Sequence, residues 1–427
     1  MTMIKTVLSQ VRQQVGDIEK VEVLVGIPTF NNAATVGSVV NAVKAGIRKV
    51  CPQASVIVVN ADAGSQDGTP ETITRTIGSD LSTVCIQHLE GGVFPSPISL
   101  QALSESGVPG REHAFRAFFT IAEALQARAC VVIDANLRSF TSDWLDVLLH
   151  PILEKSVDYV APFFRRARYE GSLTNCIIYP LNRALYGKQI RYQSGGGYGF
   201  SGKLASLYLA RNVWEGVGAR YGIDSWLTTV AVAEGCEVSQ SFLGDRVQDI
   251  KLTGVELSVV LAQAVGGLFY LMESYQDVWE GRVGSVPIPQ YGFPYEPGPV
   301  GGAINVERMV RGFRQGLRDL LPIWEIILAP ETLAGILALG VVEEEEFRFP
   351  EALWVQTIYD FALAYHEKAL HREHLLKSLT PLYLGQTASL VLRTRDGPPE
   401  DVERAIEALC RTFESMKPYL TQRWRFL

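Results

Sequence analysis

Three short apolar runs of this 427-residue chain end in side chains that could do chemistry. Pro28–Asn31 follows the first run, Asp62–Thr69 the second and Asp134–Asn136 the third. A carboxylate at such a place can accept hydrogen bonds from a base or a ribose, or hold a divalent cation beside a diphosphate. Ligands of open parallel sheets bind at the carboxyl ends of the strands. The sequence therefore predicts a ligand site where these runs end.

The acids of these segments also have a purely structural interpretation. Asp67 or Thr69 could cap the next helix, and Asp134 could cap the turn after its strand. Asp224 precedes an apolar helix, so it could be an N-cap or could present a carboxylate to a substrate as a base or electrostatic stabiliser. The sequence alone leaves these alternatives open.

The elements that must position these residues alternate between strand and helix as far as about residue 243. The expected strands are Glu22–Ile27, Ser55–Val59, Thr83–His88, Ala129–Asp134 and Asp158–Pro162. The expected helices are Ala33–Lys49, Thr69–Ile77, Glu112–Ala127, Asp143–Leu153 and Gly171–Tyr186. This alternation predicts a doubly wound, mostly parallel α/β sheet, with Phe94–Gly110 as a long loop.

Strand signals fade beyond residue 250, and long helical patterns follow. The expected helices there are Leu257–Trp279, Val306–Leu320, Leu353–His371 and Asp401–Tyr419. We therefore expect an N-terminal helix over residues 1–20, an α/β domain over 21–250 and an all-helical domain over 251–427.

Composition limits the class of protein. With 47% hydrophobic and 20% charged residues, the chain is expected to be a folded soluble protein, and a net charge of -7 argues against nucleic-acid binding. The six scattered cysteines form no CxxC pair, which favours a reducing, cytoplasmic location and disfavours zinc. No signal peptide and no membrane span are expected.

Three weaker motifs have plain alternatives. Gly197–Gly202 matches GxGxxG, but no buried strand precedes it, so a flexible loop over a ligand is preferred to a nicotinamide site. The histidines between His366 and His374 lack metal-helix spacing and indicate a solvated helix face. The basic run Arg165–Arg168 could meet an anion or lie in a solvated turn.

The order of these motifs resembles the GT-A glycosyltransferases of the family 2 type. Further segments continue the succession: Leu137–Trp144, Tyr179–Gly187, Gly195–Gly196, Tyr198–Ser201 and Gly222–Asp224. Together they resemble the mannosylglycerate and glucosylglycerate synthases over nearly the whole chain, including the helical tail. The resemblance implies a GT-A-type doubly wound mixed sheet followed by an all-helical C-terminal domain.

The resemblance also implies roles. Such enzymes transfer a hexose from a nucleotide-sugar to glycerate or a similar small acid, with retention, and use a divalent cation, Mg or Mn. The residues implied to hold the nucleotide-sugar are Pro28, Thr29, Asn31, Asp62, Arg111, Asp134, Gly195 and Gly196. Asp134 and Asn136 would lie at the metal and the ribose, and Asp224 would be catalytic, facing the acceptor or the sugar.

Three positions depart from that pattern. Asn136 stands where the family has a second strand-end acid, Gly197 stands where an acid follows the glycine pair, and Gln248 stands in place of a metal-binding histidine. Asp249 could substitute for it. An amide can bind Mg or Mn, but with less charge.

The leading hypothesis is thus a hexosyltransferase with a nucleotide-sugar donor, a small acidic acceptor and a metal at Asp134, Asn136 and Gln248, assisted by Arg111. It is expected to bind no nucleic acid, and a homodimer is compatible with the helical domain. The competing hypothesis is a catalytically silent relative that binds a nucleotide or sugar, or serves as a partner protein.

Overall fold

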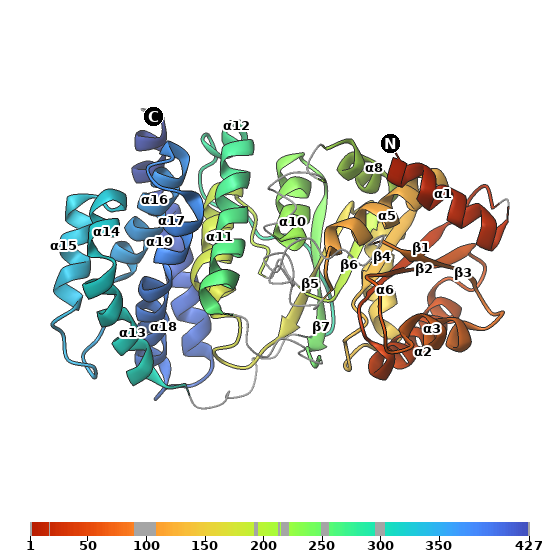
Figure 1. The fold of residues 1–427 in the computed structure, drawn as a ribbon, viewed down its shortest axis with the longest axis horizontal. Coiled ribbons are helices and arrows are strands. Elements are labelled where there is room, and N and C mark those ends of the chain that lie inside the picture. Colours follow the sequence, from red (N-terminus) through yellow and green to blue (C-terminus); the bar gives the residue numbers. More distant parts are fainter. Residues whose placement is uncertain are drawn as a thin grey trace. The chain divides into compact units, whose positions relative to one another are not determined.

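The computed structural model describes residues 2–16, 18–88, 108–191, 195–211, 214, 222–248, 256–294 and 304–425. Two compact units divide the chain. The first comprises Met1–Arg165, Tyr192–Gly254 and Ile288–Tyr295, and the second comprises Arg166–Arg191, Val255–Pro287 and Glu296–Leu427. Residues 166–191, assigned to the first domain from the sequence, therefore cluster with the second unit (Figure 1).

The first unit is built on an eight-stranded sheet in the order β3-β2-β1-β4-β6-β5-β7-β8. Its strands are β1 Val23–Thr29, β2 Val56–Asp62, β3 Ser82–Gln87, β4 Ala129–Ile133, β5 Tyr159–Arg165, β6 Gly197–Ser201, β7 Val238–Asp245 and β8 Gln290–Gly292. Only β6 runs antiparallel to its neighbours β4 and β5; the other pairs are parallel. The predicted doubly wound mixed α/β sheet is confirmed, and all five predicted strands are present.

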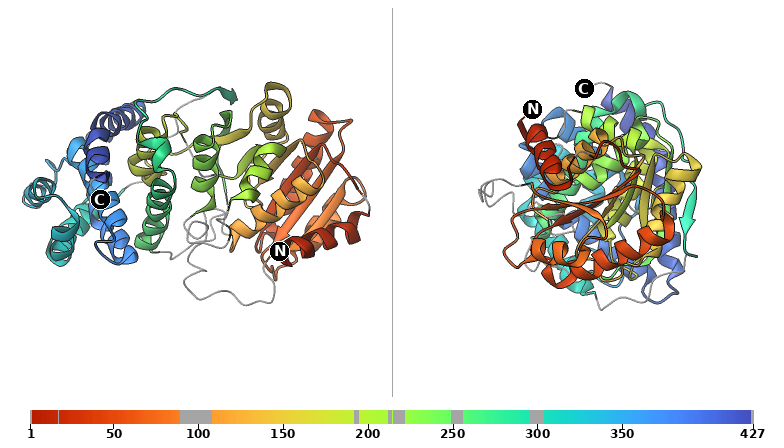
Figure 2. Two further views of the ribbon diagram at one scale, coloured as in Figure 1. Left: turned by 90° about the horizontal axis from the view of Figure 1, so that it is seen from above. Right: turned by 90° about the vertical axis from the view of Figure 1, so that its right-hand side faces the viewer.

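Helices cover both faces of this sheet (Figure 2, right). They are α1 Thr2–Val15, α2 Ala33–Val50, α3 Thr69–Ile77, α5 Arg111–Ala124, α6 Asp143–Lys155, α8 Gly202–Ala210 and α10 Ile223–Ala233. Valines of α2 and leucines of α6 pack against β1 and β4 in one apolar core. Aromatic residues of α5, α8 and β6 pack together on the other face, with Phe119 and Phe200 5.1 Å apart between ring centroids.

Strand β6 corrects one prediction. The glycine string Gly197–Gly202 was expected to be a flexible loop, but residues 197–201 form a buried strand beside β4. Gly199 is required there because a Cβ would lie 2.7 Å from the backbone oxygen of Leu148 in α6. Gly197 and Gly199 lie within this strand, and Gly202 opens α8. Since the first two glycines are part of the strand and do not follow it, the dinucleotide-binding interpretation loses its structural basis.

The second unit is helical, as predicted for the C-terminal part. Its elements are the π-helix η2 Thr174–Ile178 and the α-helices α7 Tyr179–Tyr186, α11 Leu257–Ser274, α12 Gln276–Trp279, α13 Val306–Asp319, α14 Leu321–Ile327, α15 Pro330–Leu339, α16 Glu351–Glu367, α17 Arg372–Ser378, α18 Thr380–Thr394 and α19 Glu400–Trp424. The 25-residue α19 packs against α7 and α16.

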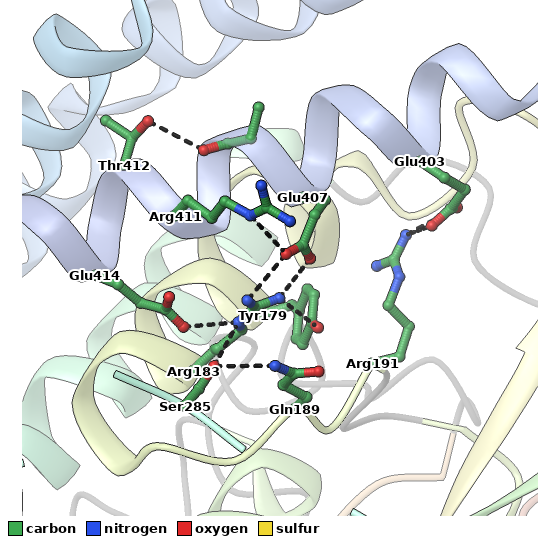
Figure 3. A network of polar contacts seen from close by, with 11 residues as sticks. Tyr179, Arg183, Gln189, Arg191, Ser285, Glu403, Glu407, Arg411, Thr412 and Glu414 are labelled. Carbon is green, nitrogen blue, oxygen red and sulfur yellow. Dashed lines mark hydrogen bonds and ion pairs between the residues drawn. The ribbon is translucent and has the colours of Figure 1, made fainter. Parts of the chain in front are cut away.

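Salt bridges of a buried arginine join α7 to α19 (Figure 3). Arg183 of α7 is 4% exposed and donates to Glu407 at 3.1 Å and to Glu414 at 2.8 Å. Arg191 donates to Asn175 at 2.7 Å and to Glu403 at 3.1 Å. These contacts explain why residues 166–191 belong with the C-terminal helices.

Helix α11 contrasts with the expectation that no apolar segment is long enough to cross a bilayer. Among the described residues it alone has the length and composition of a membrane span. Half of its 18-residue window is buried inside the protein, and a core helix of a soluble protein has the same properties.

Candidate functional site

The ends of β1 and β2 are joined by a hydrogen-bonded turn. Thr29 and Asp62 are register partners on the two strands, and the Thr29 hydroxyl donates to Asp62 Oδ1 at 2.7 Å. Asp62 Oδ2 accepts from the backbone N–H groups of Gly64 and Ser65 at 2.9 and 2.7 Å, and the Ser65 hydroxyl donates to Oδ1 at 2.6 Å. A carboxylate offers about four lone-pair positions, so all of those on Asp62 are used within the chain.

The same turn holds the other residues predicted near a nucleotide. Asn31 has a φ of +51°, donates its backbone N–H to Ser65 Oγ and accepts from Gln66 N through its side chain, both at 2.8 Å. Pro28 is buried in β1 beside Ala61. The turn is therefore fixed by its own polar groups before any ligand binds.

Asp67 has the structural role that the sequence had left open. Its carboxylate accepts from the Thr69 N–H at 3.1 Å, the Thr69 hydroxyl at 2.5 Å and the Ala33 N–H at 2.9 Å. Burial acts to raise the pKa of Asp67, but these hydrogen bonds outweigh it and the pKa is lowered. Asp67 thus closes the turn before α3 and ties it to the start of α2.

A buried ion cluster lies at the end of β4. Arg111 begins α5, is 3% exposed and forms a salt bridge through Nη1 with Asp134 Oδ1. Its Nη2 lies 3.5 Å from Asp224 Oδ1. Burial opposes the charge on Arg111, but Asp134 and Asp224 outweigh burial and raise its pKa. Three residues predicted for the site, from three distant parts of the sequence, are thus brought together.

Asp224 is not the N-cap of its helix. Gly222 precedes α10, and Asp224 is the second residue of that helix, with its carboxylate accepting from the Tyr198 hydroxyl at 2.6 Å. Burial first, and then the charge of Asp224, raise the pKa of Tyr198, so this hydroxyl stays protonated. The carboxylate is therefore oriented by an arginine and a tyrosine.

The glycine pair supports both acids. The Gly195 N–H donates to the Tyr198 hydroxyl at 2.9 Å, and the Gly196 carbonyl accepts from Asp134 N at 2.9 Å. A Cβ on Gly196 would lie 2.5 Å from the Leu137 side chain and 3.1 Å from Asp134 Cβ. Backbone contact with Asp134 thus requires glycine here.

Two residues of this site were missed from the sequence. Tyr198 stood inside a glycine string taken for a loop, and only its place on a strand brings its hydroxyl to Asp224. His88 ends the third predicted strand, and its Nε2 lies 3.1 Å from the Pro109 carbonyl, beside the turn that leads into Arg111. A polar residue at a strand end was the available signal for His88.

The proposed metal ligands form a poor cation site. Asn136 is buried, and Gln248 lies opposite Leu137 in an isolated bridge, so the structure does bring it close to the end of β4. Both are neutral amides, while Asp134 is already paired with Arg111. No group of three or more His, Cys, Asp or Glu side chains suited to a metal occurs among the described residues. Gly197 lies in β6, and Asp249 is outside the described part of the chain.

The electrostatic repulsion between such a cation and Arg111 supports this conclusion. A doubly charged cation about 5 Å from the Arg111 guanidinium would be repelled by roughly 7 kcal/mol at an effective dielectric constant of about 20. The charge of Asp134 is already balanced by Arg111, and the two neutral amides add no negative charge to offset that repulsion. The residues present therefore do not fit a divalent cation in this arrangement.

The other basic and histidine motifs have structural partners. Arg165 forms a salt bridge with Asp245 at 2.5 Å, and Arg168 donates to the carbonyls of Thr394 and Pro398 after α18. In the second unit His366 stacks on Trp424, whereas His371 and His374 are exposed. The solvated-face interpretation therefore holds for the last two histidines only.

Comparison with known proteins gives structural neighbours alone. No family model and no curated protein matches the chain. Glucosyl-3-phosphoglycerate synthase from Mycobacterium tuberculosis, in complex with Mn²⁺, UDP and phosphoglyceric acid, is 18% identical over 61% of this chain and 81% of that chain, with a TM-score of 0.39. Its complex with Mn²⁺ and UDP-glucose is 17% identical over 70% and 91% of the two chains (TM-score 0.38). A mycobacterial protein is 17% identical over 62% and 78% (TM-score 0.41). At this level of similarity, the function has to be inferred from the side chains of the chain itself.

Proposed function

We propose that this chain is a glycosyltransferase that moves a hexose from a nucleotide-sugar to a small acidic acceptor, with retention. The observation that carries the proposal is the buried Arg111 guanidinium between Asp134 and Asp224, at the carboxyl end of a doubly wound sheet. Ligands bind at that edge in open α/β sheets. The acidic acceptor and the retention of configuration are proposed from the resemblance of the motif succession to the mannosylglycerate and glucosylglycerate synthases.

The chemistry assigns a task to each group. Cleavage of the donor leaves negative charge on the nucleoside diphosphate, and a preorganised cation near that charge lowers the barrier. Arg111, as the first residue of α5, combines its guanidinium with the positive end of a helix dipole. Asp224, held by Tyr198, would orient the acceptor hydroxyl or accept its proton.

The turn at Thr29, Asn31 and Asp62 would shape the nucleotide side of the site. Because the Asp62 carboxylate is saturated by internal donors, its contribution would come through the backbone that it holds in place. The base and ribose would meet the ends of β1 and β2, while the diphosphate would lie toward β4.

The test is calorimetric titration of UDP-glucose, GDP-glucose and GDP-mannose, followed by transfer assays with glycerate and phosphoglycerate. We expect one donor to bind and a hexose to be transferred. Asp224→Asn should abolish transfer, by a factor of about 10² or more for a general base, while nucleotide binding is spared. Transfer that persists in this variant would remove Asp224 from the mechanism.

A second candidate is the catalytically silent relative. The observation in its favour is that Asp134 is paired with Arg111 and that Asn136 stands two residues later, so the acids expected to handle a metal are reduced to one. Donor binding without hydrolysis or transfer, with every acceptor tried, would favour this candidate over the enzyme.

A further inference from the structure

We propose that Arg111 takes the place of a divalent cation in this site, so that a nucleoside diphosphate binds without metal. The inference rests on the proposed function and adds to it the means by which the diphosphate is held. Its starting point is the poor fit of Asp134, Asn136 and Gln248 to a divalent cation.

The first step concerns the partner of Asp134. This carboxylate is 2% exposed, and the guanidinium of Arg111 already serves as its counter-charge. A cation bound at Asp134 would have to displace that guanidinium or tolerate a like charge beside it. The neighbouring Asn136 and Gln248 add no negative charge to favour the exchange.

The second step concerns the donors that Arg111 has left. Its Nη1 is engaged by Asp134, and among the described residues the polar contact of Nη2 is the one with Asp224 at 3.5 Å, which is long for a hydrogen bond. Nε is buried and has no hydrogen-bond partner among the described residues. Buried donors in native proteins are nearly always satisfied, so this Nε–H is a donor that an acceptor brought by a ligand could use.

The third step concerns geometry. Nε and Nη2 share one edge of the planar guanidinium, and this fork matches two oxygens of a phosphate. Arg111 is also the first residue of a 14-residue helix, whose N-terminal N–H groups and dipole favour an anion. A diphosphate on this fork would compete with the weak contact to Asp224 and leave the bond to Asp134 in place.

The ligand class is therefore a nucleoside diphosphate, and the probe is UDP, with GDP as the alternative base. We expect the Kd of the wild-type chain for the better of the two to differ by less than about threefold between EDTA and Mn²⁺. Arg111→Gln should weaken binding about 10- to 100-fold, as expected for the loss of charge-assisted hydrogen bonds. Arg111→Lys keeps the charge but lacks the fork, so its Kd should lie between those of wild type and Arg111→Gln.

Two controls make the result specific. Arg48→Ala removes an exposed guanidinium at the end of α2 and should leave the Kd unchanged. Asp224→Asn removes a negative charge beside the fork and should bind at least as tightly as wild type. Because the comparison of EDTA with Mn²⁺ uses the wild-type chain, the test does not depend on whether Arg111→Gln folds.

The outcomes separate this inference from the proposed function. Binding that Mn²⁺ strengthens by more than about tenfold would overturn the inference and leave the transferase intact. No binding of either nucleotide, with or without metal, would overturn both. The inference is supported if wild type binds equally in EDTA and Mn²⁺, and if this binding is lost in Arg111→Gln and kept in Arg48→Ala.

Discussion

Replacing Tyr198 by phenylalanine would remove a single oxygen atom from the ion cluster. The ring of Tyr198 is fully buried and would stay in place, packed 6.0 Å from both Phe115 and Phe200. What is lost is the 2.6 Å donation to Asp224 and the acceptor for the Gly195 N–H. The substitution therefore tests the polar support of Asp224 with little change in packing.

The expected loss of stability follows from these two hydrogen bonds. A hydrogen bond to a charged group contributes about 1.5–3 kcal/mol, and a buried donor left without an acceptor costs about 1–3 kcal/mol. Allowing for partial relaxation, we expect Tyr198→Phe to lower the free energy of unfolding by about 2–4 kcal/mol. For a unit of 150–250 residues this lowers Tm by about 4–16 °C.

Tyr159→Phe is the matched control. Tyr159 is equally buried and packs on the same Phe200 ring, but its hydroxyl pairs with the neutral Thr228 hydroxyl at 2.8 Å. A neutral pair contributes about 0.5–1.5 kcal/mol. The difference between the two variants therefore isolates the contribution of the carboxylate.

Calorimetric scans would measure the loss, and hydrogen exchange of peptides covering β6 would assign it to the first unit. In the transfer assay Tyr198→Phe should lower kcat and leave the KM for the donor nearly unchanged, because Tyr198 acts through Asp224. If Tyr198→Phe costs no more stability than Tyr159→Phe, the buried carboxylate does not depend on this hydroxyl, and the reasoning about the cluster is wrong.

Two further predictions concern charge and pH. Burial lowers the pKa of His88 to about 4, so between about pH 6.5 and 4 the unfolded chain binds more protons than the folded chain. The free energy of unfolding of the wild type should therefore fall by up to about 3 kcal/mol as the pH is lowered through this range. His88→Gln should lose less over the same range in a pH series of denaturant titrations. Arg183→Met should lower the free energy of unfolding by about 2–3 kcal/mol at neutral pH, which is less than for a fully buried ion pair because Glu407 is partly exposed. Since hydrogen bonding to Arg183 lowers the pKa of Glu407, that stabilisation is present above the ordinary glutamate pKa, and the gap between wild type and variant should narrow below about pH 4.5. A stability difference between wild type and Arg183→Met that does not change with pH would contradict the role given to Glu407. A pH dependence of stability in His88→Gln that is parallel to that of wild type would contradict the role given to His88.

The sequence predicted the first half of the sheet well because each strand there is a β-branched run that ends in polar residues. Such runs are buried on both faces in parallel sheets, so their signal is strong. Strand β6 was missed because two of its five residues, Gly197 and Gly199, are glycines, which are depleted in strands and weaken the signal of the aromatic residues between them. Packing against α6, where only glycine fits at position 199, overrides that propensity.

The site could be predicted only as a set of residues. Arg111, Asp134 and Asp224 were each identified, but their mutual contacts depend on how α5, β4 and α10 converge, which no local pattern encodes. Local pattern also could not reveal that Asp62 is saturated, since two of its four donors are backbone N–H groups of the turn that it holds. The side chains can be named from the sequence, whereas their hydrogen-bond partners require the structure.

The balance of charge in the cluster makes Arg111 its central group. Two carboxylates face one guanidinium, and both acids are largely buried, so removing the arginine would leave two like charges with poor solvation. Binding a diphosphate adds further negative charge, which the fork of Arg111 and the N-terminus of α5 must share. Because Asp224 makes the weaker contact with Arg111, it is the acid whose contact a phosphate can replace. Donor binding would then leave the carboxylate of Asp224 held by Tyr198 and available to an acceptor hydroxyl, which couples occupancy of the donor site to readiness for transfer.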